Sequence, residues 1–280
     1  CLVGSEMCIR DRLQQHRPDA IVNFPAESHN SRAIMDPAIF MRTNALGTQM
    51  LLEAARRTNV LRFHHISTCE VYGDLALDSN ESFREDSPLR PRTPYNASKA
   101  AADLIVSAYH ETFGVATTIS NCANNYGPYQ HPEKLIPNLT TRALDARPLL
   151  LYRQSDYRRE WLHVDDHCRA IEAILLHGGI GETYNVGSGD ERSIDDIAAA
   201  VLEATGRPDS LKVYVDDRPG HDRRYLLDHT KLERELGWRP LVRFADGLRA
   251  TVDWYAGHRS WWLPKLGSVP DESAWHERRT

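Results

Sequence analysis

The 280-residue sequence predicts an α/β protein, in which a parallel sheet is joined to a smaller mixed α/β part. Two observations lead to this fold class. Short β-branched or aromatic runs alternate with helical patterns through residue 121, an order typical of parallel strands joined by crossover helices. Polar groups follow three of these strands, at residues 26–29, 68–70 and 121–125. Because ligands of such sheets bind at the carboxyl ends of the strands, these groups are candidates for one functional site.

The elements of the first part are predicted from apolar periodicity and from turn residues. In chain order they are a helix end at 13–17, a strand at 19–24, a helix at 36–58, a strand at 62–68, a helix at 98–113 and a strand at 115–121.

The second part is more mixed. Residues 193–206 predict a helix that begins after a Ser cap and stops at a Gly. The other expected elements are a strand running into a helix at 159–175, a strand and turn at 181–189, a strand with a polar cluster at 211–225, and short amphipathic helices at 230–238 and 245–258.

Composition excludes several classes of protein. The net charge is −5 and the basic residues form no long run, which argues against a nucleic-acid binder. No apolar stretch approaches the roughly 18 residues of a membrane span, and no signal peptide is recognisable. The five cysteines show no paired spacing. They indicate a reducing cytoplasm and no disulfide framework.

The strongest chemical pattern is Tyr95-Asn-Ala-Ser-Lys99. Residues four apart share a helix face, and an ammonium near a phenol lowers the pKa of the phenol, so Tyr95 is a candidate base. One βα unit upstream, the strand end carries Thr68, Cys69 and Glu70. A metal site formed by His163, His167 and Cys168 lacks a supporting second motif, and we expect no metal.

Together these segments resemble the extended short-chain dehydrogenase/reductase family, and within it the dTDP-glucose 4,6-dehydratases. The resemblance runs from about residue 13 to the end of the chain. Its most specific parts are RFHHISTCEVYGD (62–74), TPYNASKAAAD (93–103), NCANNYGPYQHPEKLIP (121–137) and DRPGHDRRY (217–225). The resemblance implies a Rossmann-type sheet, an NAD cofactor and a nucleotide-sugar substrate.

The family mechanism, read onto this chain, implies five catalytic residues: Thr68, Cys69, Glu70, Tyr95 and Lys99. Tyr95, assisted by Lys99, takes the proton of the sugar 4-hydroxyl while hydride passes to NAD, and Thr68 binds the 4-oxygen. Glu70 then removes the C5 proton, water leaves from C6, and hydride returns to C6. The product is dTDP-4-keto-6-deoxyglucose.

Cys69 departs from the family pattern, which has Asp at this position as the acid for water loss. Two interpretations stay open. The thiol, which is mostly protonated at neutral pH, donates the proton; or Cys69 is a packed small residue and another group or water is the acid.

The resemblance also implies binding residues. Those for NAD are Ala26, Glu27, Ser28, Thr43, Tyr95, Lys99 and Asn125. Those for the nucleotide sugar are Ser28, Asn124, Lys134, Leu135, Arg159, Arg218 and His221. Two local departures occur near them: Phe24-Pro25 stands where the family has Leu-Ala, and Asn30-Ser31 where it has Val-Asp.

The N-terminal region departs most strongly. Residues 1–12 do not match the family, and we interpret them as a non-native leader. No Gly-rich dinucleotide-binding turn occurs, so the first βαβα units of the sheet are expected to be missing, and we expect this chain to bind NAD poorly. The expected domains are a partial NAD-binding domain at 13–126, with a return segment at about 159–187, and a mainly substrate-binding domain at 127–280.

Alternative functions remain at this point. They are a UDP-glucuronate decarboxylase, a sugar-nucleotide 4-epimerase and an inactive fragment or scaffold. An epimerase does not need Glu70, and nothing in the sequence identifies a cation for the carboxylate that a decarboxylase removes. A cytoplasmic homodimer that pairs through parts of 36–58 and 95–113 is also expected from the resemblance.

Overall fold

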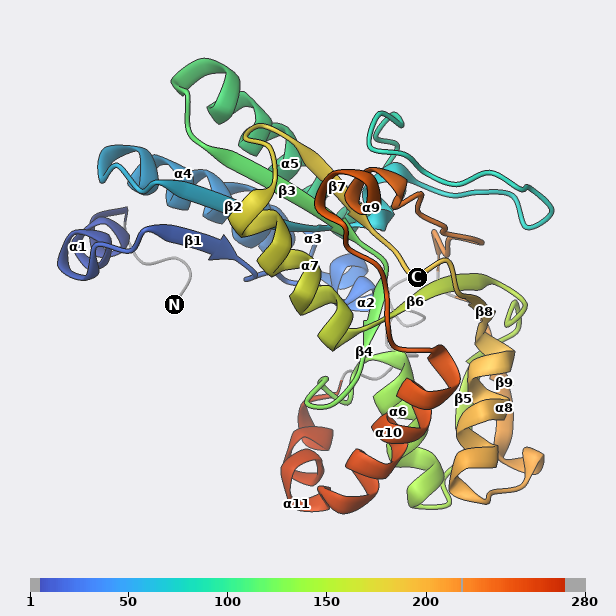
Figure 1. The fold of residues 1–280 in the computed structure, drawn as a ribbon. Coiled ribbons are helices and arrows are strands. Elements are labelled where there is room, and N and C mark those ends of the chain that lie inside the picture. Colours follow the sequence, from blue (N-terminus) through green and yellow to red (C-terminus); the bar gives the residue numbers. More distant parts are fainter. Residues whose placement is uncertain (1–5, 218, 270–280) are drawn as a thin grey trace.

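The computed structural model describes residues 6–217 and 219–269, and its largest sheet has four parallel strands. Their order is β1-β2-β3-β7, so neighbouring strands are joined by crossovers, as predicted (Figure 1). The strands are β1 (Ala20–Asn23), β2 (Arg62–Thr68), β3 (Thr117–Cys122) and β7 (Thr183–Val186).

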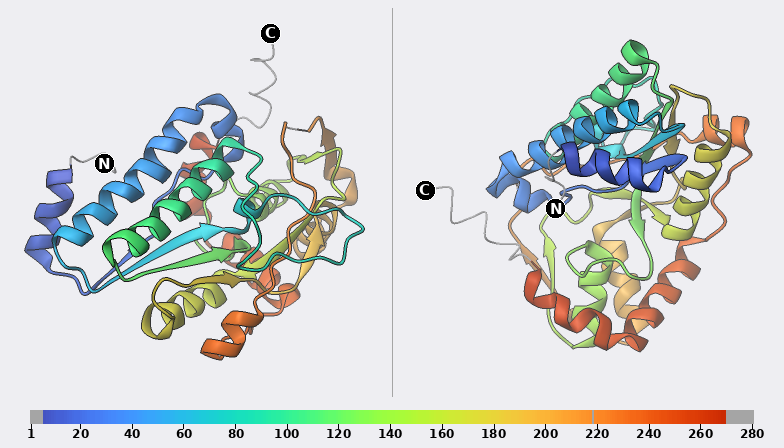
Figure 2. Two further views of the ribbon diagram at one scale, coloured as in Figure 1. Left: turned by 90° about the horizontal axis from the view of Figure 1, so that it is seen from above. Right: turned by 90° about the vertical axis from the view of Figure 1, so that its left-hand side faces the viewer.

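Helices cover both faces of this sheet (Figures 1 and 2). One face packs against α4 (Gly47–Arg57) and α5 (Pro94–Phe113), through a core that includes Leu52, Phe63 and Val106. The other face packs against α7 (Val164–His177). The remaining helical segments before β2 are α1 (Glu6–His16), α2 (Asn30–Met35), α3 (Pro37–Phe40) and a π-helical segment, Met41–Leu46.

The second part lies at the carboxyl end of the sheet and has its own core. Its strands are β4 (Asn124–Tyr126), β6 (Arg158–His163) and β8 (Glu191–Ser193) in one sheet, and β5 (Leu149–Tyr152) and β9 (Lys212–Val215) in a parallel pair. Its helices are α6 (Leu135–Leu144), α8 (Ile194–Thr205), α10 (Phe244–Gly257) and α11 (Arg259–Trp262), whereas α9 (Thr230–Leu236) packs against β7 and α7 of the first part. The described chain also contains short 3₁₀ segments at Cys69–Tyr72, Asp209–Leu211 and Leu263–Ser268.

Two predicted helices differ from the structure in an informative way. Helix α5 begins at Pro94 and not at Ser98, because the Thr93 hydroxyl caps the amide of Asn96 and proline suits the first helical turn. The helix predicted at 36–58 is interrupted by the π-helical segment. Helix α8 is confirmed with its predicted Ser193 cap and Gly206 stop.

The three polar strand ends meet at one edge of the sheet, as predicted. Strands β1, β2 and β3 are adjacent and parallel, so their carboxyl ends point the same way. The chain leaves β3 and enters the second part at β4, which places that part directly over this edge. In the described ranges no helix is long and apolar enough to span a membrane.

Candidate active site

Tyr95 and Lys99 lie in the first two turns of α5, where both side chains are buried. The early start of α5 puts the predicted pair in register on one helix face. Lys99 Nζ donates a hydrogen bond of 2.6 Å to the carbonyl of Ile66 at the end of β2. This bond ties the helix to the strand that carries the other candidate catalytic residues.

Thr68, Cys69 and Glu70 form the turn that ends β2. The Thr68 hydroxyl accepts a hydrogen bond from the amide of Glu70 (3.3 Å) and so caps a short 3₁₀ turn. In this turn successive side chains point in different directions. Glu70 lines a cavity, where its carboxylate accepts a hydrogen bond from Asn30 Nδ2 (3.2 Å), while Cys69 points into the core.

Burial decides the ionisation of Tyr95. Its pKa is raised well above the ordinary value, first by burial and then by the charge of Glu70, while a hydrogen bond with Thr68 lowers it. The sequence predicts a lowered pKa, and this prediction is wrong for the structure as described. The reason is that burial takes the phenolate out of water and the charge of Glu70 further disfavours it, while the only opposing effect among the described residues is the Thr68 hydrogen bond.

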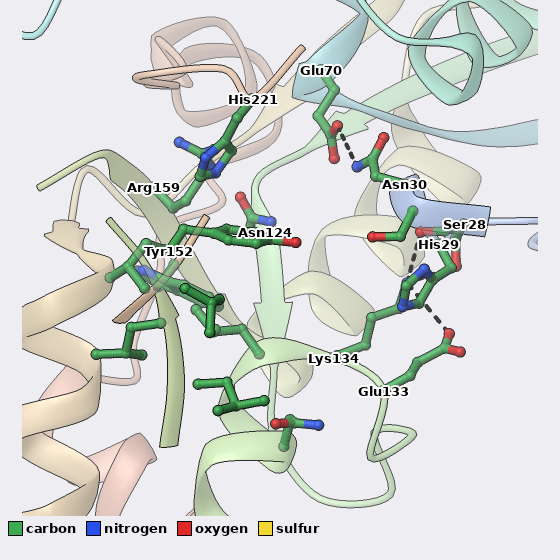
Figure 3. Close-up of a pocket in the computed structure, with 18 of the residues that line it drawn as sticks. Ser28, His29, Asn30, Glu70, Asn124, Glu133, Lys134, Tyr152, Arg159 and His221 are labelled. Carbon is green, nitrogen blue, oxygen red and sulfur yellow. Dashed lines mark hydrogen bonds and ion pairs between the residues drawn. The ribbon is translucent and has the colours of Figure 1, made fainter. Parts of the chain in front are cut away.

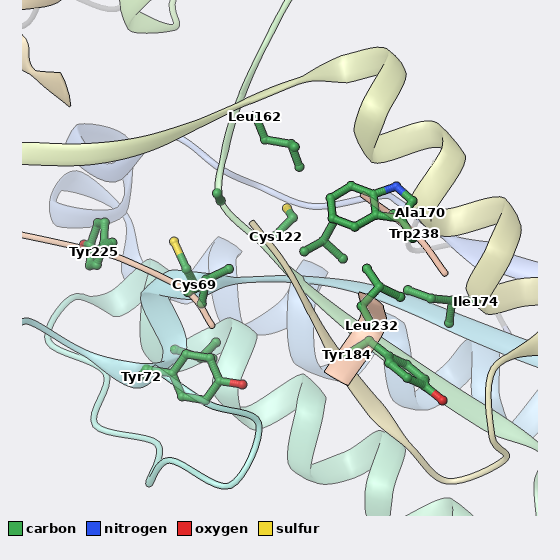
Figure 4. Packing of buried hydrophobic residues seen from close by; sticks show 14 of the residues in the cluster. Cys69, Tyr72, Cys122, Leu162, Ala170, Ile174, Tyr184, Tyr225, Leu232 and Trp238 are labelled. Atoms are coloured by element: carbon green, nitrogen blue, oxygen red, sulfur yellow. The ribbon is translucent and has the colours of Figure 1, made fainter. Parts of the chain in front are cut away.

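Cys69 lies in a hydrophobic cluster and is only 2% exposed. Figure 4 shows it among Tyr72, Cys122 and Tyr225. The residues that line the two cavities described below do not include Cys69. Burial and the nearby Glu70 raise the pKa of the thiol well above its ordinary value, so the group is protonated and only weakly acidic.

One cavity, of about 240 Å³, gathers the predicted nucleotide-sugar residues (Figure 3). It lies between the polar strand ends and the second part of the chain. Six of the seven predicted residues line it: Ser28, Asn124, Lys134, Leu135, Arg159 and His221. Arg218, the seventh, lies outside the described residues.

Two basic side chains of this cavity, Lys134 and Arg159, are held in place by hydrogen bonds to oxygens of neighbouring residues. Lys134 Nζ donates to the carbonyl and the hydroxyl of Ser28 (2.7 and 2.9 Å). The Arg159 guanidinium donates to the carbonyls of Arg158 and Asp222 (2.7 and 2.6 Å) and lies over the ring of Tyr225. A fixed guanidinium of this kind suits a diphosphate, since its planar fork matches two oxygens at once.

A second cavity, of about 450 Å³, adjoins the first. Glu70 and Ser28 line both cavities, so the candidate base lies at their junction. Five of the predicted NAD residues line the second cavity: Ala26, Ser28, Tyr95, Lys99 and Asn125. The cavity-lining residues do not include Glu27 and Thr43.

Unpartnered polar atoms make the second cavity fit a polar ligand. Among the described residues, the buried side-chain oxygens Asn124 Oδ1 and Asn125 Oδ1 have no hydrogen-bond partner. Buried polar groups are normally satisfied, so these amides, together with the Lys99 ammonium, suit the hydroxyls and amide of a nicotinamide nucleotide.

Sequence reasoning missed several cavity residues. Asn30 bonds Glu70, and its own amide oxygen accepts from Thr93 (3.1 Å), the cap of α5. The sequence showed that Asn30 departs from the family pattern, but it did not show that Asn30 bonds Glu70. Arg142 and Tyr152 also line the first cavity, on a helix and a strand that no local motif singled out. The described residues contain no group of three or more potential metal ligands.

Comparison with known proteins gives one consistent result. The family model described as GDP-mannose 4,6 dehydratase matches residues 4–251. A dTDP-glucose 4,6-dehydratase of Streptomyces niveus is 50% identical over 255 residues, which cover 91% of this chain and 74% of the relative.

Solved structures agree. The dTDP-glucose 4,6-dehydratase DesIV of Streptomyces venezuelae, crystallised with NAD, superposes with a TM-score of 0.90 at 48% identity. The match covers 93% of this chain and 80% of the DesIV chain. A UDP-glucose 4-epimerase of Thermus thermophilus in complex with NAD has a TM-score of 0.85 at 29% identity, covering 91% and 83%. The chain therefore belongs to the GDP-mannose 4,6-dehydratase family, and within it to the dTDP-glucose 4,6-dehydratases.

Proposed function

We propose that this protein is a lyase that converts dTDP-glucose to dTDP-4-keto-6-deoxyglucose, with NAD as its cofactor. The observation that carries the proposal is the position of Glu70, which lies at the junction of two cavities that hold the Tyr95–Lys99 pair and the predicted nucleotide-sugar residues. A 4-epimerase needs only the oxidation half of this arrangement. The relatives that are dehydratases are also more similar than the epimerases, at 50% against 29% identity.

The test is to incubate the chain with NAD and dTDP-glucose and to follow the product by mass. Loss of one water supports the proposal. Loss of carbon dioxide from UDP-glucuronate identifies the decarboxylase alternative, and inversion at C4 without a change of mass identifies the epimerase. If the chain binds NAD but converts neither substrate, the result supports a non-catalytic role.

Tyr95 takes the proton of the sugar 4-hydroxyl. When bound, NAD⁺ supplies a hydride acceptor and a positive charge. Because the pKa of Tyr95 is raised by burial, the phenol is protonated in the described state, and an added positive charge favours the phenolate. The Thr68 hydroxyl, whose hydrogen bond lowers the pKa of Tyr95, directs the phenol oxygen and the substrate 4-oxygen toward each other.

Glu70 removes the C5 proton, which the neighbouring ketone makes acidic. Asn30 Nδ2 donates to the carboxylate, so it orients Glu70 and favours its ionised form. Thr93 fixes the Asn30 amide and also caps α5. The base for elimination and the helix that carries the base for oxidation are therefore joined by one hydrogen-bonded chain.

We propose that Cys69 is a packed residue and that a group or water in the cavity protonates the departing C6 hydroxyl. Its burial outside the cavity-lining set and its raised pKa support this interpretation. We expect Cys69→Ala to lose less than about 10-fold in the rate of water loss, whereas removal of a general acid costs about 10²–10⁴-fold. Thermal unfolding of the variant controls for lost packing, and a loss above about 100-fold in a folded variant would make Cys69 the acid.

We propose that two copies pair through α4 and α5, as the resemblance implies. Apolar side chains exposed on α5 support this pairing: Leu104 is 62% exposed and Phe113 is 52% exposed. We expect light scattering to show a dimer of the 31.9 kDa chain.

A charge on α5 is expected to disrupt that dimer. Leu104→Glu should give a monomer, because burial of a carboxylate in an apolar contact is unfavourable. Leu176→Glu, on α7 and also 62% exposed, is the matched control and should leave the dimer intact. A dimer in Leu104→Glu and a monomer in Leu176→Glu would place the interface on the opposite face.

We also propose a cytoplasmic location. The support is that Cys69, Cys122 and Cys168 are free thiols, which persist in a reducing compartment.

A further inference from the structure

A buried polar cluster adjoins the Tyr95–Lys99 pair. Its members His65, Ser67 and Asp103 are all buried. His65 and Asp103 are absent from the residues that line either cavity. Any effect they have on the reaction must therefore pass through another side chain.

Hydrogen bonds at the far end of the cluster determine the tautomer of His65. Thr48 Oγ1 donates to the carbonyl of Asn44 (2.7 Å), so its oxygen accepts the bond from Asn23 Nδ2 (3.0 Å). The same Asn23 nitrogen lies 3.1 Å from His65 Nδ1. Because an amide nitrogen only donates, Nδ1 is the acceptor, and the neutral ring carries its proton on Nε2. Burial keeps the ring neutral by lowering the pKa of His65 well below its ordinary value.

The proton on Nε2 directs His65 toward Asp103. Nε2 lies 3.5 Å from Asp103 Oδ1 and 3.4 Å from Lys99 Nζ, and an N–H group cannot accept from an ammonium. Asp103 Oδ2 accepts a bond of 2.8 Å from the Ser67 hydroxyl. Among the described residues Oδ1 is buried without a hydrogen-bond partner, and the Nε2–H group of His65 lies within ion-pair distance of it.

Asp103 and Lys99 are one helical turn apart and influence each other through space. Burial lowers the pKa of Lys99, and the charge of Asp103 is the largest effect that opposes it. Burial raises the pKa of Asp103 to about 7, and Lys99 and then Ser67 oppose that rise. The titratable groups that face this pair are His65 from β2, Tyr72 from the 3₁₀ turn and Cys122 from β3.

We propose that Asp103 is a positioning residue whose buried carboxylate, held by a hydrogen bond from Ser67, keeps Lys99 protonated one helical turn after Tyr95. Without this anion, burial leaves the ammonium without a compensating charge, and Lys99 loses its proton at lower pH. The consequence for catalysis rests on the function proposed above, in which Lys99 assists Tyr95. The coupling of the two charges does not depend on it.

The chain is well suited to a direct test, since it has only five lysines: Lys99, Lys134, Lys212, Lys231 and Lys265. Lysine labelled with ¹³C at Cε gives one NMR signal for each, assigned by Lys→Arg substitution, and its shift reports protonation. The measurement needs neither cofactor nor substrate. Failure of the proposed function in the water-loss assay therefore leaves this test intact.

The expected results are specific to Lys99. In the wild type its signal is that of an ammonium at pH 7, with a small coupled step near pH 7 as Asp103 titrates. Asp103→Asn should lower the Lys99 midpoint by about 1–3 pH units. Asp103→Glu, which keeps the charge, should leave the Lys99 midpoint close to its wild-type value. Signals of the other four lysines should not move.

Ser67→Ala is a second and milder variant. It removes a bond that favours the Asp103 carboxylate, so the coupled step should move to higher pH while the Lys99 midpoint changes little. The proposal is overturned if Lys99 is neutral at pH 7 in the wild type, if its midpoint is the same in folded Asp103→Asn, or if the coupled step is absent.

In an active enzyme the same change should appear in the pH profile. Asp103→Asn should displace a limb of the kcat profile, whereas a purely structural defect lowers kcat at every pH without moving its limbs.

Discussion

Glu70→Gln is expected to lower the rate of water loss from dTDP-glucose by about 10²–10⁴-fold, the usual contribution of a general base. Glutamine keeps the size of the side chain and can still pair with Asn30, but it cannot accept the C5 proton. Oxidation at C4 depends on Tyr95 and is not affected. The variant should therefore accumulate reduced cofactor after substrate is added, which can be followed by the absorbance of NADH.

The control for this variant is Glu111→Gln, an exposed glutamate on α5 outside both cavities. It should convert substrate at the wild-type rate. If Glu70→Gln loses water at more than about one tenth of the wild-type rate, Glu70 is not the base. If no reduced cofactor appears, Glu70 acts before elimination.

Tyr95→Phe is expected to abolish both steps, with a loss of about 10²–10⁴-fold in turnover and no reduced cofactor. The phenyl ring retains the packing of Tyr95 against Phe40, so the fold should be preserved. Only the hydroxyl that exchanges a proton with the sugar is lost. The absence of reduced cofactor distinguishes this variant from Glu70→Gln, because oxidation must precede elimination.

The pH dependence of oxidation tests the same assignment. Because the pKa of Tyr95 is raised, little phenolate is present at neutral pH, and the oxidation rate should rise with pH as the phenolate forms. Tyr214→Phe, an exposed tyrosine on β9, is the control and should keep the wild-type profile. Full oxidation by Tyr95→Phe at any pH would exclude Tyr95 as the base.

Local patterns in the sequence predicted much of the fold. The strand at 62–68 and the helix at 193–206 have the predicted bounds within a residue or two. Both signals, a β-branched or aromatic run and a pair of helix caps, depend only on residues close together in the chain. The predicted start of α5 is four residues late, because the Thr93 cap and Pro94 begin the helix before its apolar periodicity does. Strands β4, β5 and β8 are only three or four residues long and carry too little periodicity to be recognised.

The candidate site also has residues that the sequence predicted and contacts that only the structure shows. Residue types at a strand end indicated Thr68 and Glu70, and the four-residue spacing on one helix face indicated Tyr95 and Lys99. All four line the second cavity. Asn30 is 40 residues from Glu70 in sequence, so its bond to the Glu70 carboxylate follows only from the packing of α2 against the strand ends. The same holds for His65 and Asp103, whose roles depend on a network that crosses α5 and β2.

By itself the sequence determined the α/β class, the Tyr-Lys pair and the family, because these are carried by periodicity and by residues close together in the chain. Only the tertiary structure decided which side of the strand end each side chain faces and how deeply it is buried. Burial reverses the expected direction of the pKa of Tyr95 and removes Cys69 from the cavity lining. The physical reason is that the stability of a charge depends on the water and the dipoles around it, and these come from segments distant in the chain.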